Sequence, residues 1–308
     1  MQITTAQLTP ILVALASFFA THAAAQDLAW YKHATAKDPA TQAALENCEA
    51  QAARLGSGDG PTYIDAGCGE LVFRSAPPWL IQVSADQSYA VAARGSLILI
   101  RMLKAGPDSD AWISGKNTEL ARIQSLTLDG AKNEISVLTS KPKQILTFSA
   151  KVPGNVAPIR VLDAATTPEL GDPRSIAVDS KTGTLALVDA EKASVTLVPR
   201  AFPGPAPVVT LSGKKTELDA PTSVAIDSAH GKLFVLESNR RRVLVFSLAA
   251  GVLSDQAPEQ VIALSEASDT SQSPPRAIAY RASSNRLEII HEDGTLSRLS
   301  LDRSAPQL

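Results

Sequence analysis

The sequence contains few of the residues that usually build catalytic or metal sites, and it has little net charge. Its 308 residues include two cysteines and four histidines, and aromatic residues make up 5%. With 29 Lys and Arg against 31 Asp and Glu, the formal charge is −2, so there is no positive excess for a nucleic-acid backbone. No apolar run reaches the length of a membrane-spanning helix. We therefore expect neither nucleic-acid binding nor membrane insertion.

The first 25 residues contain no Lys, Arg, Asp or Glu. An apolar run over residues 11–20 precedes Ala23-Ala24-Ala25, which is the small-residue pattern found before the cleavage point of secretory signals. Secretory signals usually carry Lys or Arg in their first residues, whereas here the α-amino group is the only positive charge in this region. The alternative, an uncleaved anchor, would need a longer apolar run. We expect residues 1–25 to be a signal peptide and the mature protein, beginning at Gln26, to be periplasmic or secreted.

An N-terminal segment, residues 26–68, has the pattern of one short helix followed by a loop. Asp38 suits the N-cap of this helix and Pro39 its first position. Cys48 falls on the apolar stripe of the helix, and Cys68 lies in the segment that follows. In an oxidising compartment such a pair predicts a disulfide. The alternatives are a zinc site, which would need further ligands, or a reactive thiol.

From residue 80 onward the sequence changes to short β-type runs separated by turn residues, and these runs recur. Each copy has an inner strand, often led by proline, and then a second strand, with a period of about 50 residues. The inner-strand copies are residues 126–129, 176–179, 224–227 and 277–280, with a degenerate first copy at 81–83. No amphipathic helix separates the strands. This pattern is typical of four-stranded propeller blades.

We therefore expect an all-β fold, a β-propeller of four-stranded blades over residues 69–308, after the short helical segment. Five blades are counted, and a sixth would require a further half-blade within residues 57–80. The last copy has only three strands and ends at 299–301. We expect residues 71–73 to supply its missing outer strand, because closure of the ring removes the open sheet edge.

One copy of the repeat resembles an NHL repeat. It combines a Pro-led inner strand, a glycine hairpin, and an acidic residue followed by Asn and Arg, which are here Pro221, Gly231, Glu237, Asn239 and Arg242. The resemblance implies an exported, bacterial-type NHL-like propeller, related to six-bladed propellers. NHL propellers include protein-binding and RNA-binding modules and a few metal-dependent lyases, and related six-bladed propellers include lactonases. Such motifs specify the fold rather than the function.

Three glutamates stand four residues before equivalent inner-strand positions, each followed by a leucine: Glu119, Glu169 and Glu217. In a propeller these loops share one face, so the carboxylates predict a ring that would suit a hard cation, with calcium as the candidate. The alternative is that the leucines pack between blades and the carboxylates face water. No other cofactor is expected.

Two arginines follow prolines at the start of their inner strands on the same face. Arg174 and Arg276 would suit a carboxylate or phosphate ligand, or they would pair with Asp172 and Asp269 in the adjoining loops. His291 occupies the acidic position before a third strand, and no second histidine joins it. These residues complete the set of candidate ligand-binding side chains.

The sequence favours a binding or scaffolding module for a protein or small ligand, with no chemistry of its own. The alternative is a metal-dependent lactonase-type hydrolase or lyase with its site at the mouth of the central channel. No nucleophile elbow, phosphate loop or paired metal motif is present. The concentrated positive run, Arg240-Arg241-Arg242, lies among acidic entry loops and lacks aromatic platforms for bases.

Overall fold

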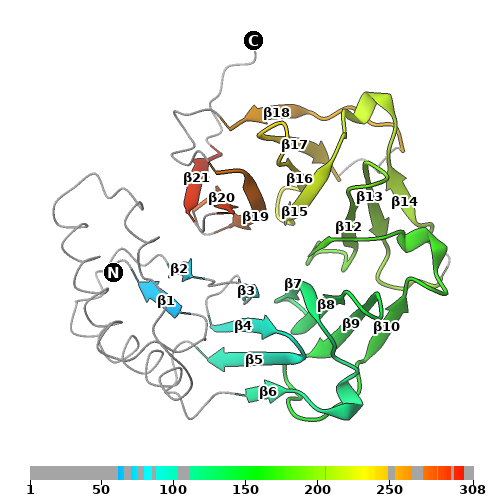
Figure 1. Ribbon diagram of the computed structural model, residues 1–308, viewed down its shortest axis with the longest axis vertical. Helices are drawn as coiled ribbons and strands as arrows, with labels where there is room; N and C mark the ends of the chain where they lie inside the picture. The colour runs from blue at the N-terminus through cyan, green and yellow to red at the C-terminus, as the bar shows by residue number, and fades with distance from the viewer. Residues whose placement is uncertain are drawn as a thin grey trace. The chain divides into compact units, whose positions relative to one another are not determined.

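A computed structural model describes ten stretches of the chain (Figure 1), namely residues 62–65, 71–74, 80–84, 88–102, 111–204, 206–248, 254–264, 273–282, 284–292 and 295–301. The chain divides into two compact units, Met1–Ile113 and Ser114–Leu308. The predictions for the signal peptide, for the helix beginning near Asp38 and for Cys48 and Cys68 concern residues outside these stretches. They stay predictions.

The first unit contains a hairpin and one four-stranded antiparallel sheet. The hairpin pairs β1 (Thr62–Asp65) with β2 (Leu71–Arg74). The sheet, called blade 1, has the strand order β3 (Leu80–Val83), β4 (Tyr89–Arg94), β5 (Leu97–Met102) and β6 (Ala111–Ile113).

The prediction that residues 71–73 form the outer strand of the last blade is wrong. β2 pairs with β1, its neighbour in the chain, and the last sheet consists of three strands among the described residues. Pairing β2 with β1 closes a short loop and loses little chain entropy. Pairing β2 with a strand near the C-terminus closes a very long loop and loses more. The hairpin lies within residues 57–80, where a sixth half-blade was considered, and forms a separate two-stranded sheet.

The second unit contains four antiparallel sheets in chain order, called blades 2 to 5. Blade 2 consists of β7 (Ile123–Asp129), β8 (Glu134–Thr139), β9 (Gln144–Ser149) and β10 (Arg160–Asp163). Blade 3 consists of β11 (Ser175–Val178), β12 (Leu185–Asp189), β13 (Ser194–Val198) and β14 (Val209–Leu211).

Blades 4 and 5 repeat this arrangement. Blade 4 consists of β15 (Pro221–Asp227), β16 (Lys232–Glu237), β17 (Arg242–Ser247) and β18 (Gln260–Ala263). Blade 5 consists of β19 (Pro275–Arg281), β20 (Arg286–His291) and β21 (Leu296–Ser300). The all-β, five-bladed propeller of four-stranded sheets predicted from the repeats is thus confirmed, with three strands described in blade 5.

The core of the second unit lies between neighbouring sheets. Leu138 and Leu162 of blade 2 pack with Ile176 and Leu187 of blade 3, and all four are nearly inaccessible to solvent. Similar clusters join blade 3 to blade 4 and blade 4 to blade 5. A sheet buried on both faces needs apolar side chains on both sides. This requirement explains why the second and third strands read as nearly continuous apolar runs.

Serine hydroxyls join the inner strands of successive blades. The Oγ atom of Ser125 accepts a hydrogen bond from the backbone N–H of Ile176 at 3.1 Å. Ser175 accepts one from the N–H of Val224 at 3.4 Å, and Ser223 continues the series toward blade 5. Inner strands of neighbouring blades do not pair as a sheet, so these hydroxyls satisfy N–H groups that would otherwise be buried without a partner. The described part of the chain contains no helix long and apolar enough to cross a membrane.

Candidate functional site

The loops that lead into the inner strands and the turns between second and third strands lie at the same end of each sheet. This follows from the register, because the first inner-strand residue pairs with the last residue of the second strand, as in Pro221 with Glu237 and Pro275 with His291. We call this end the entry face of the second unit. The sequence-based prediction that the candidate loops share one end of the sheets is consistent with this register.

Two loops on the entry face share one sequence and one conformation. Residues 114–120 and 212–218 both read Ser-Gly-Lys-x-Thr-Glu-Leu, two blades apart. Each contains a one-turn 3-10 helix, Lys116–Thr118 (η3) and Lys214–Thr216 (η5). The glycine before each helix has a φ of 115° or 111°, a conformation that an L side chain rarely adopts.

The two loops are held by the same internal hydrogen bonds. The hydroxyls of Thr118 and Thr216, both fully buried, donate to the carbonyl oxygen of the preceding glycine at 2.7 Å in each loop. A side chain from the loop before the outer strand completes each turn. Asn155 accepts from the N–H of Asn117 at 2.9 Å, and Asp255 accepts from the N–H of Lys215 at 2.9 Å. The loops are therefore preorganised.

The three predicted glutamates are exposed, and their surroundings differ. Glu217 binds Arg242 at 3.0 Å. Glu119 has the same left-handed backbone, with φ 56° against 57° for Glu217, but makes no ion pair with the described residues. Glu169 lies inside a third one-turn 3-10 helix, Pro168–Leu170 (η4). The structure therefore gives Glu119 and Glu217 the same backbone position after a 3-10 helix, and places Glu169 differently.

The leucines that follow these glutamates pack inward. Leu120 and Leu170 are 8% and 1% exposed, and Leu218 packs against the cluster between blades 3 and 4. In the described stretches, no group of three or more His, Cys, Asp or Glu is arranged to hold a metal ion. Calcium binding stays a prediction.

The described contacts do not bring Arg174 and Arg276 together at one ligand site. Arg174 forms an exposed ion pair with Glu191 at 3.2 Å, rather than with Asp172, which pairs with Lys143. Arg276 is exposed at the start of β19, at the bulge position next to Pro275. Asp269, the partner considered for it, lies outside the described residues.

Buried polar residues at the ends of the second strands hold the entry loops in place. Asp189 accepts from the N–H of Asp172 at 3.0 Å, and Glu237 accepts from the N–H of Asp219 at 2.6 Å. His291, at the equivalent position, is 1% exposed. At this position blades 3 and 4 have a carboxylate, blade 2 has Thr139 and blade 5 has His291.

The contacts of His291 also indicate which of its ring nitrogens carries a proton. Its Nδ1 lies 3.0 Å from the carbonyl oxygen of Ser273, and since a carbonyl only accepts, Nδ1 carries the proton. Its Nε2 lies 2.9 Å from the hydroxyl of Ser297. Both ring nitrogens thus make contacts within the protein, as expected of a histidine that positions a loop.

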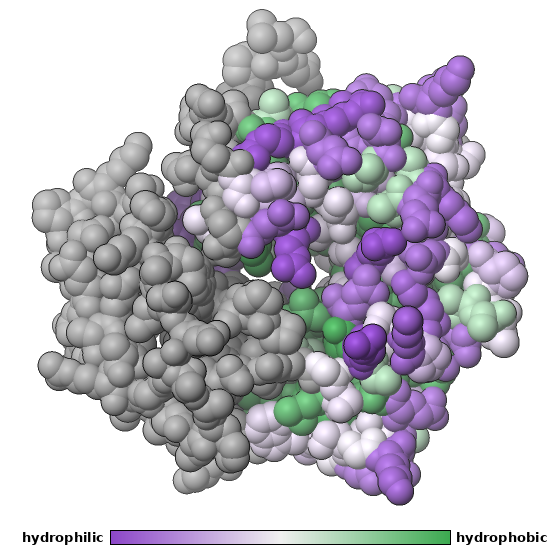
Figure 2. Space-filling model, in the orientation of Figure 1, coloured by the Kyte–Doolittle hydropathy of each residue, from purple (hydrophilic) through white to green (hydrophobic). Residues whose placement is uncertain are grey.

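The three consecutive arginines all make contacts within the protein. Arg240 pairs with Asp219 at 3.1 Å, and Arg241 donates to the carbonyl oxygen of Ser273 at 2.8 Å. Arg242 binds buried Glu237 at 2.6 Å. The charge of this run is therefore largely compensated. Over the coloured part of the surface in Figure 2, hydrophilic and apolar side chains are interspersed.

Sequence reasoning found the glutamates and missed two features of the site. It did not extract the seven-residue loop motif, although Ser-Gly-Lys-x-Thr-Glu-Leu recurs exactly in the sequence. It also missed the serine series, whose signal is Ser125, Ser175 and Ser223 at corresponding positions of three copies. Both become visible when the copies are aligned over the entry loops as well as the strands.

No family model matches the chain, and no curated protein matches it. Solved structures do. The β-propeller domain of Cps50 (Swd1) from Myceliophteria thermophila matches with a TM-score of 0.51 and 10% identity, over 72% of this chain and 65% of that chain. Raptor from Chaetomium thermophilum matches with a TM-score of 0.51 and 14% identity, over 81% of this chain and 22% of that chain.

This chain spans just under two thirds of the Cps50 (Swd1) domain and about a fifth of Raptor, 65% and 22% of their lengths. At such low identity the likeness concerns the fold alone. It agrees with the sheet topology, in which successive four-stranded antiparallel sheets follow one another along the chain. The chain is thus similar in fold to β-propeller domains.

Proposed function

We propose that this protein is a binding or scaffolding module that presents the entry face of blades 2 to 4 to a protein partner. The observation that carries the proposal is the repeated loop, Ser-Gly-Lys-x-Thr-Glu-Leu, displayed twice in one conformation. Loops on one face of a repeat protein are its usual binding surface, because they vary without disturbing the stacked core.

The exposed parts of these loops support a binding role. Lys116, Lys214 and Lys215 are exposed and make no ion pair with the described residues. Glu119 and Glu217 keep left-handed backbones in both copies, although a glycine would adopt this conformation with less strain. Glu217 binds Arg242, but Glu119 makes no ion pair with the described residues, and a side chain at its strained position is explained if it contacts a partner.

A charge-reversal experiment tests the proposal. The triple variant Lys116→Glu, Lys214→Glu, Lys215→Glu changes exposed tips and should fold normally. Immobilised wild-type protein and variant are offered the soluble extract of the source cells, and captured proteins are quantified by mass spectrometry. The matched control is Lys181→Glu, which reverses an exposed charge in the turn between β11 and β12, at the opposite end of the sheet.

The proposal requires at least one protein whose capture falls with the triple variant and is unchanged with the control. Equal capture by all three proteins, or no specific capture, would show that the entry face is not the binding surface.

We also propose that the module works outside the cytoplasm and is related to NHL-like propellers. The uncharged apolar leader ending in Ala23-Ala24-Ala25 and the Cys48 and Cys68 pair support export. The intact mass of the exported protein should match a chain that begins at Gln26, and thiol titration after denaturation should find no free thiol. A retained leader or two free thiols would contradict this proposal.

A further inference from the structure

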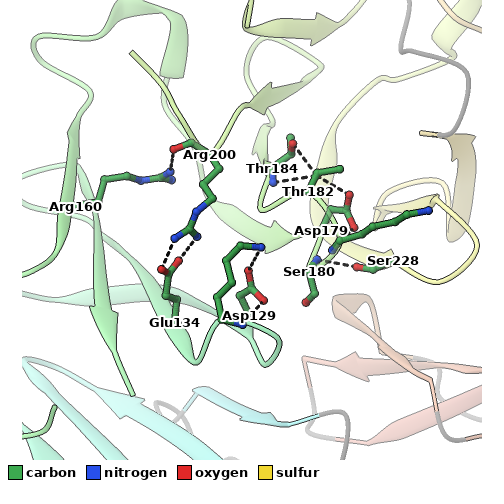
Figure 3. A network of polar contacts seen from close by, with 11 residues as sticks. Asp129, Glu134, Arg160, Asp179, Ser180, Thr182, Thr184, Arg200 and Ser228 are labelled. Carbon is green, nitrogen blue, oxygen red and sulfur yellow. Dashed lines mark hydrogen bonds and ion pairs between the residues drawn. The ribbon is translucent and has the colours of Figure 1, made fainter. Parts of the chain in front are cut away.

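A cluster of charged residues lies between blades 2 and 3, at the end of the sheets opposite the entry face. Glu134 is the first residue of β8, Arg160 is the first residue of β10, and Arg200 follows β13. Figure 3 shows Arg200 extending from blade 3 to the carboxylate of Glu134, with Arg160 reaching toward the backbone of Arg200. We call these three residues the inter-blade cluster.

Glu134 and Arg200 form a complete ion pair within this cluster. The two terminal nitrogens of Arg200 donate to the two carboxylate oxygens of Glu134, which is the bidentate geometry that carboxylates and guanidinium groups prefer. The hydrogen bond from Arg200 lowers the pKa of the Glu134 carboxyl. The negative charge of Glu134 is therefore already matched by Arg200.

Arg160 has no such counterion. Its Nη1 donates to the backbone carbonyl oxygen of Arg200 at 2.6 Å, and no carboxylate among the described residues lies within ion-pair distance of it. Its Nε atom is buried and has no hydrogen-bond partner. Burial, and next the neighbouring charge of Arg200, lower the pKa of the Arg160 guanidinium, and the more distant carboxylate of Glu134 offsets only part of this. A partly buried cation without a counterion is costly, so the cluster favours an added anion.

Exposed apolar residues neighbour Arg160 in the sequence, and because side chains alternate along a strand, Ile159 and Val161 lie on the opposite face of the strand from its guanidinium. Ile159 and Val161 flank it and are 58% and 41% exposed, and Val152 on the same β9–β10 connection is 53% exposed. These are three of the five large apolar side chains that are exposed in the described part of the chain. Such a local concentration of apolar surface is typical of contact sites. It favours an anion carried by an apolar ligand over a free inorganic ion.

We propose that the inter-blade cluster binds an acidic side chain of a partner protein, presented in a segment with apolar residues on both sides. The carboxylate of the partner lies against the guanidinium of Arg160, and the flanking apolar side chains cover Ile159 and Val161. The charge of the ligand complements the single uncompensated positive charge of the cluster. Arg160 and Val161 are not part of the entry loops, although the β9–β10 connection before them holds loop 114–120 through Asn155. The cluster therefore adds a second contact to the proposed binding function.

The experiment uses the ¹⁵N-labelled full chain and follows the side-chain Nε–Hε signal of Arg160, which is identified by its loss in Arg160→Lys. The probes are an acetylated and amidated peptide, Thr-Ile-Glu-Val-Thr, the same peptide with Gln in place of Glu, and sodium acetate. We expect a saturable shift of the Arg160 signal with the Glu peptide. Binding of the Gln peptide and of acetate should be weaker by roughly tenfold or more.

Two variants separate the contributions of charge and apolar contact. Val161→Ser, at an exposed position that should not affect folding, should weaken binding of the Glu peptide severalfold while acetate binding is unchanged. Lys181→Gln, which removes a positive charge elsewhere at the same end of the sheets, should leave peptide binding unchanged. Equal binding of the Glu and Gln peptides, equal binding of acetate, or no shift with any probe would overturn the proposal. The proposed role of the entry face would stand in each case, since its loops are not touched.

Discussion

The hydroxyl of Ser223 on β15 accepts a hydrogen bond from the backbone N–H of Ile278 on β19, at 3.2 Å. The same hydroxyl lies 3.4 Å from that of Ser175 in the preceding blade. A single small side chain thus links three successive inner strands. Because Ser223 is only 6% exposed, water cannot readily replace it.

Ser223→Ala should therefore destabilise the protein by about 1–2 kcal/mol, because the N–H of Ile278 would be left buried without an acceptor. Alanine itself fits such a position, since Ala277 occurs there in blade 5. Denaturant unfolding measures the change. The control is Ser140→Ala, which removes an exposed hydrogen bond to the carbonyl oxygen of Arg122. Equal effects of the two substitutions would show that the inter-blade bond contributes little.

Glu237→Gln should be among the most destabilising conservative changes on the entry face, at about 3 kcal/mol, because it breaks a buried ion pair. Glu237 is 1% exposed and binds both the N–H of Asp219 and the guanidinium of Arg242. Thermal and denaturant unfolding provide the measurement. Arg174→Gln breaks an exposed pair instead and should cost about 0.5 kcal/mol or less. A small effect of Glu237→Gln would indicate that Glu217 alone can hold Arg242.

Glu134 should make stability depend on pH in the acid range. Its pKa is lowered below the ordinary value of 4.5, mainly by the hydrogen bond from Arg200. A carboxyl with a depressed folded-state pKa stabilises the protein above its unfolded-state pKa, and this contribution is lost as pH falls through the folded-state pKa. The stability difference between wild type and Glu134→Gln should therefore be largest near neutral pH and shrink below 4.5.

Denaturant unfolding at several pH values measures this difference. The control is Glu169→Gln, which removes an exposed carboxylate without an ion pair among the described residues and should change stability little. A difference that is constant down to strongly acid pH would mean that the bidentate pair with Arg200 does not form.

Tyr280 should titrate at unusually high pH. Burial, followed by the neighbouring Asp227 carboxylate, raises its pKa to about 12 from 10.0. Its hydroxyl donates to Oδ1 of Asn285 at 3.1 Å, and its ring stacks on Phe234 with centroids 5.5 Å apart. A raised folded-state pKa contributes stability that is present below the unfolded value and is lost as pH rises from about 10 toward 12. The absorbance change of phenolate formation, compared between wild type and Tyr280→Phe, should place this residue near 12.

Asp227→Asn separates the two causes. It removes the neighbouring negative charge but leaves the phenol buried, so the pKa of Tyr280 should fall only part of the way back to 10.0. A Tyr280 signal that titrates at the ordinary value in wild-type protein would mean that the ring is exposed in solution.

The repeat pattern predicted the inner and second strands closely, because the sequence signals for both lie within a few residues of each strand. The predicted copy at residues 176–179 corresponds to β11 (Ser175–Val178), and the glycine-led second strand corresponds to β16 (Lys232–Glu237). Alternation and turn residues act within a few positions of the chain, so sequence reasoning can detect them. The partner of residues 71–74 depended instead on competition between a near and a distant strand, and the sequence pattern could not decide it.

The sequence by itself determined the all-β class and the blade period, since these follow from local hydrophobic order and repetition. Only the tertiary structure decided which charges are compensated. Arg242 meets Glu237 and Glu217, whereas Arg160 meets the backbone carbonyl of Arg200 and no carboxylate. Ion pairing depends on distances between side chains from different strands and blades, and a one-dimensional pattern does not contain those distances.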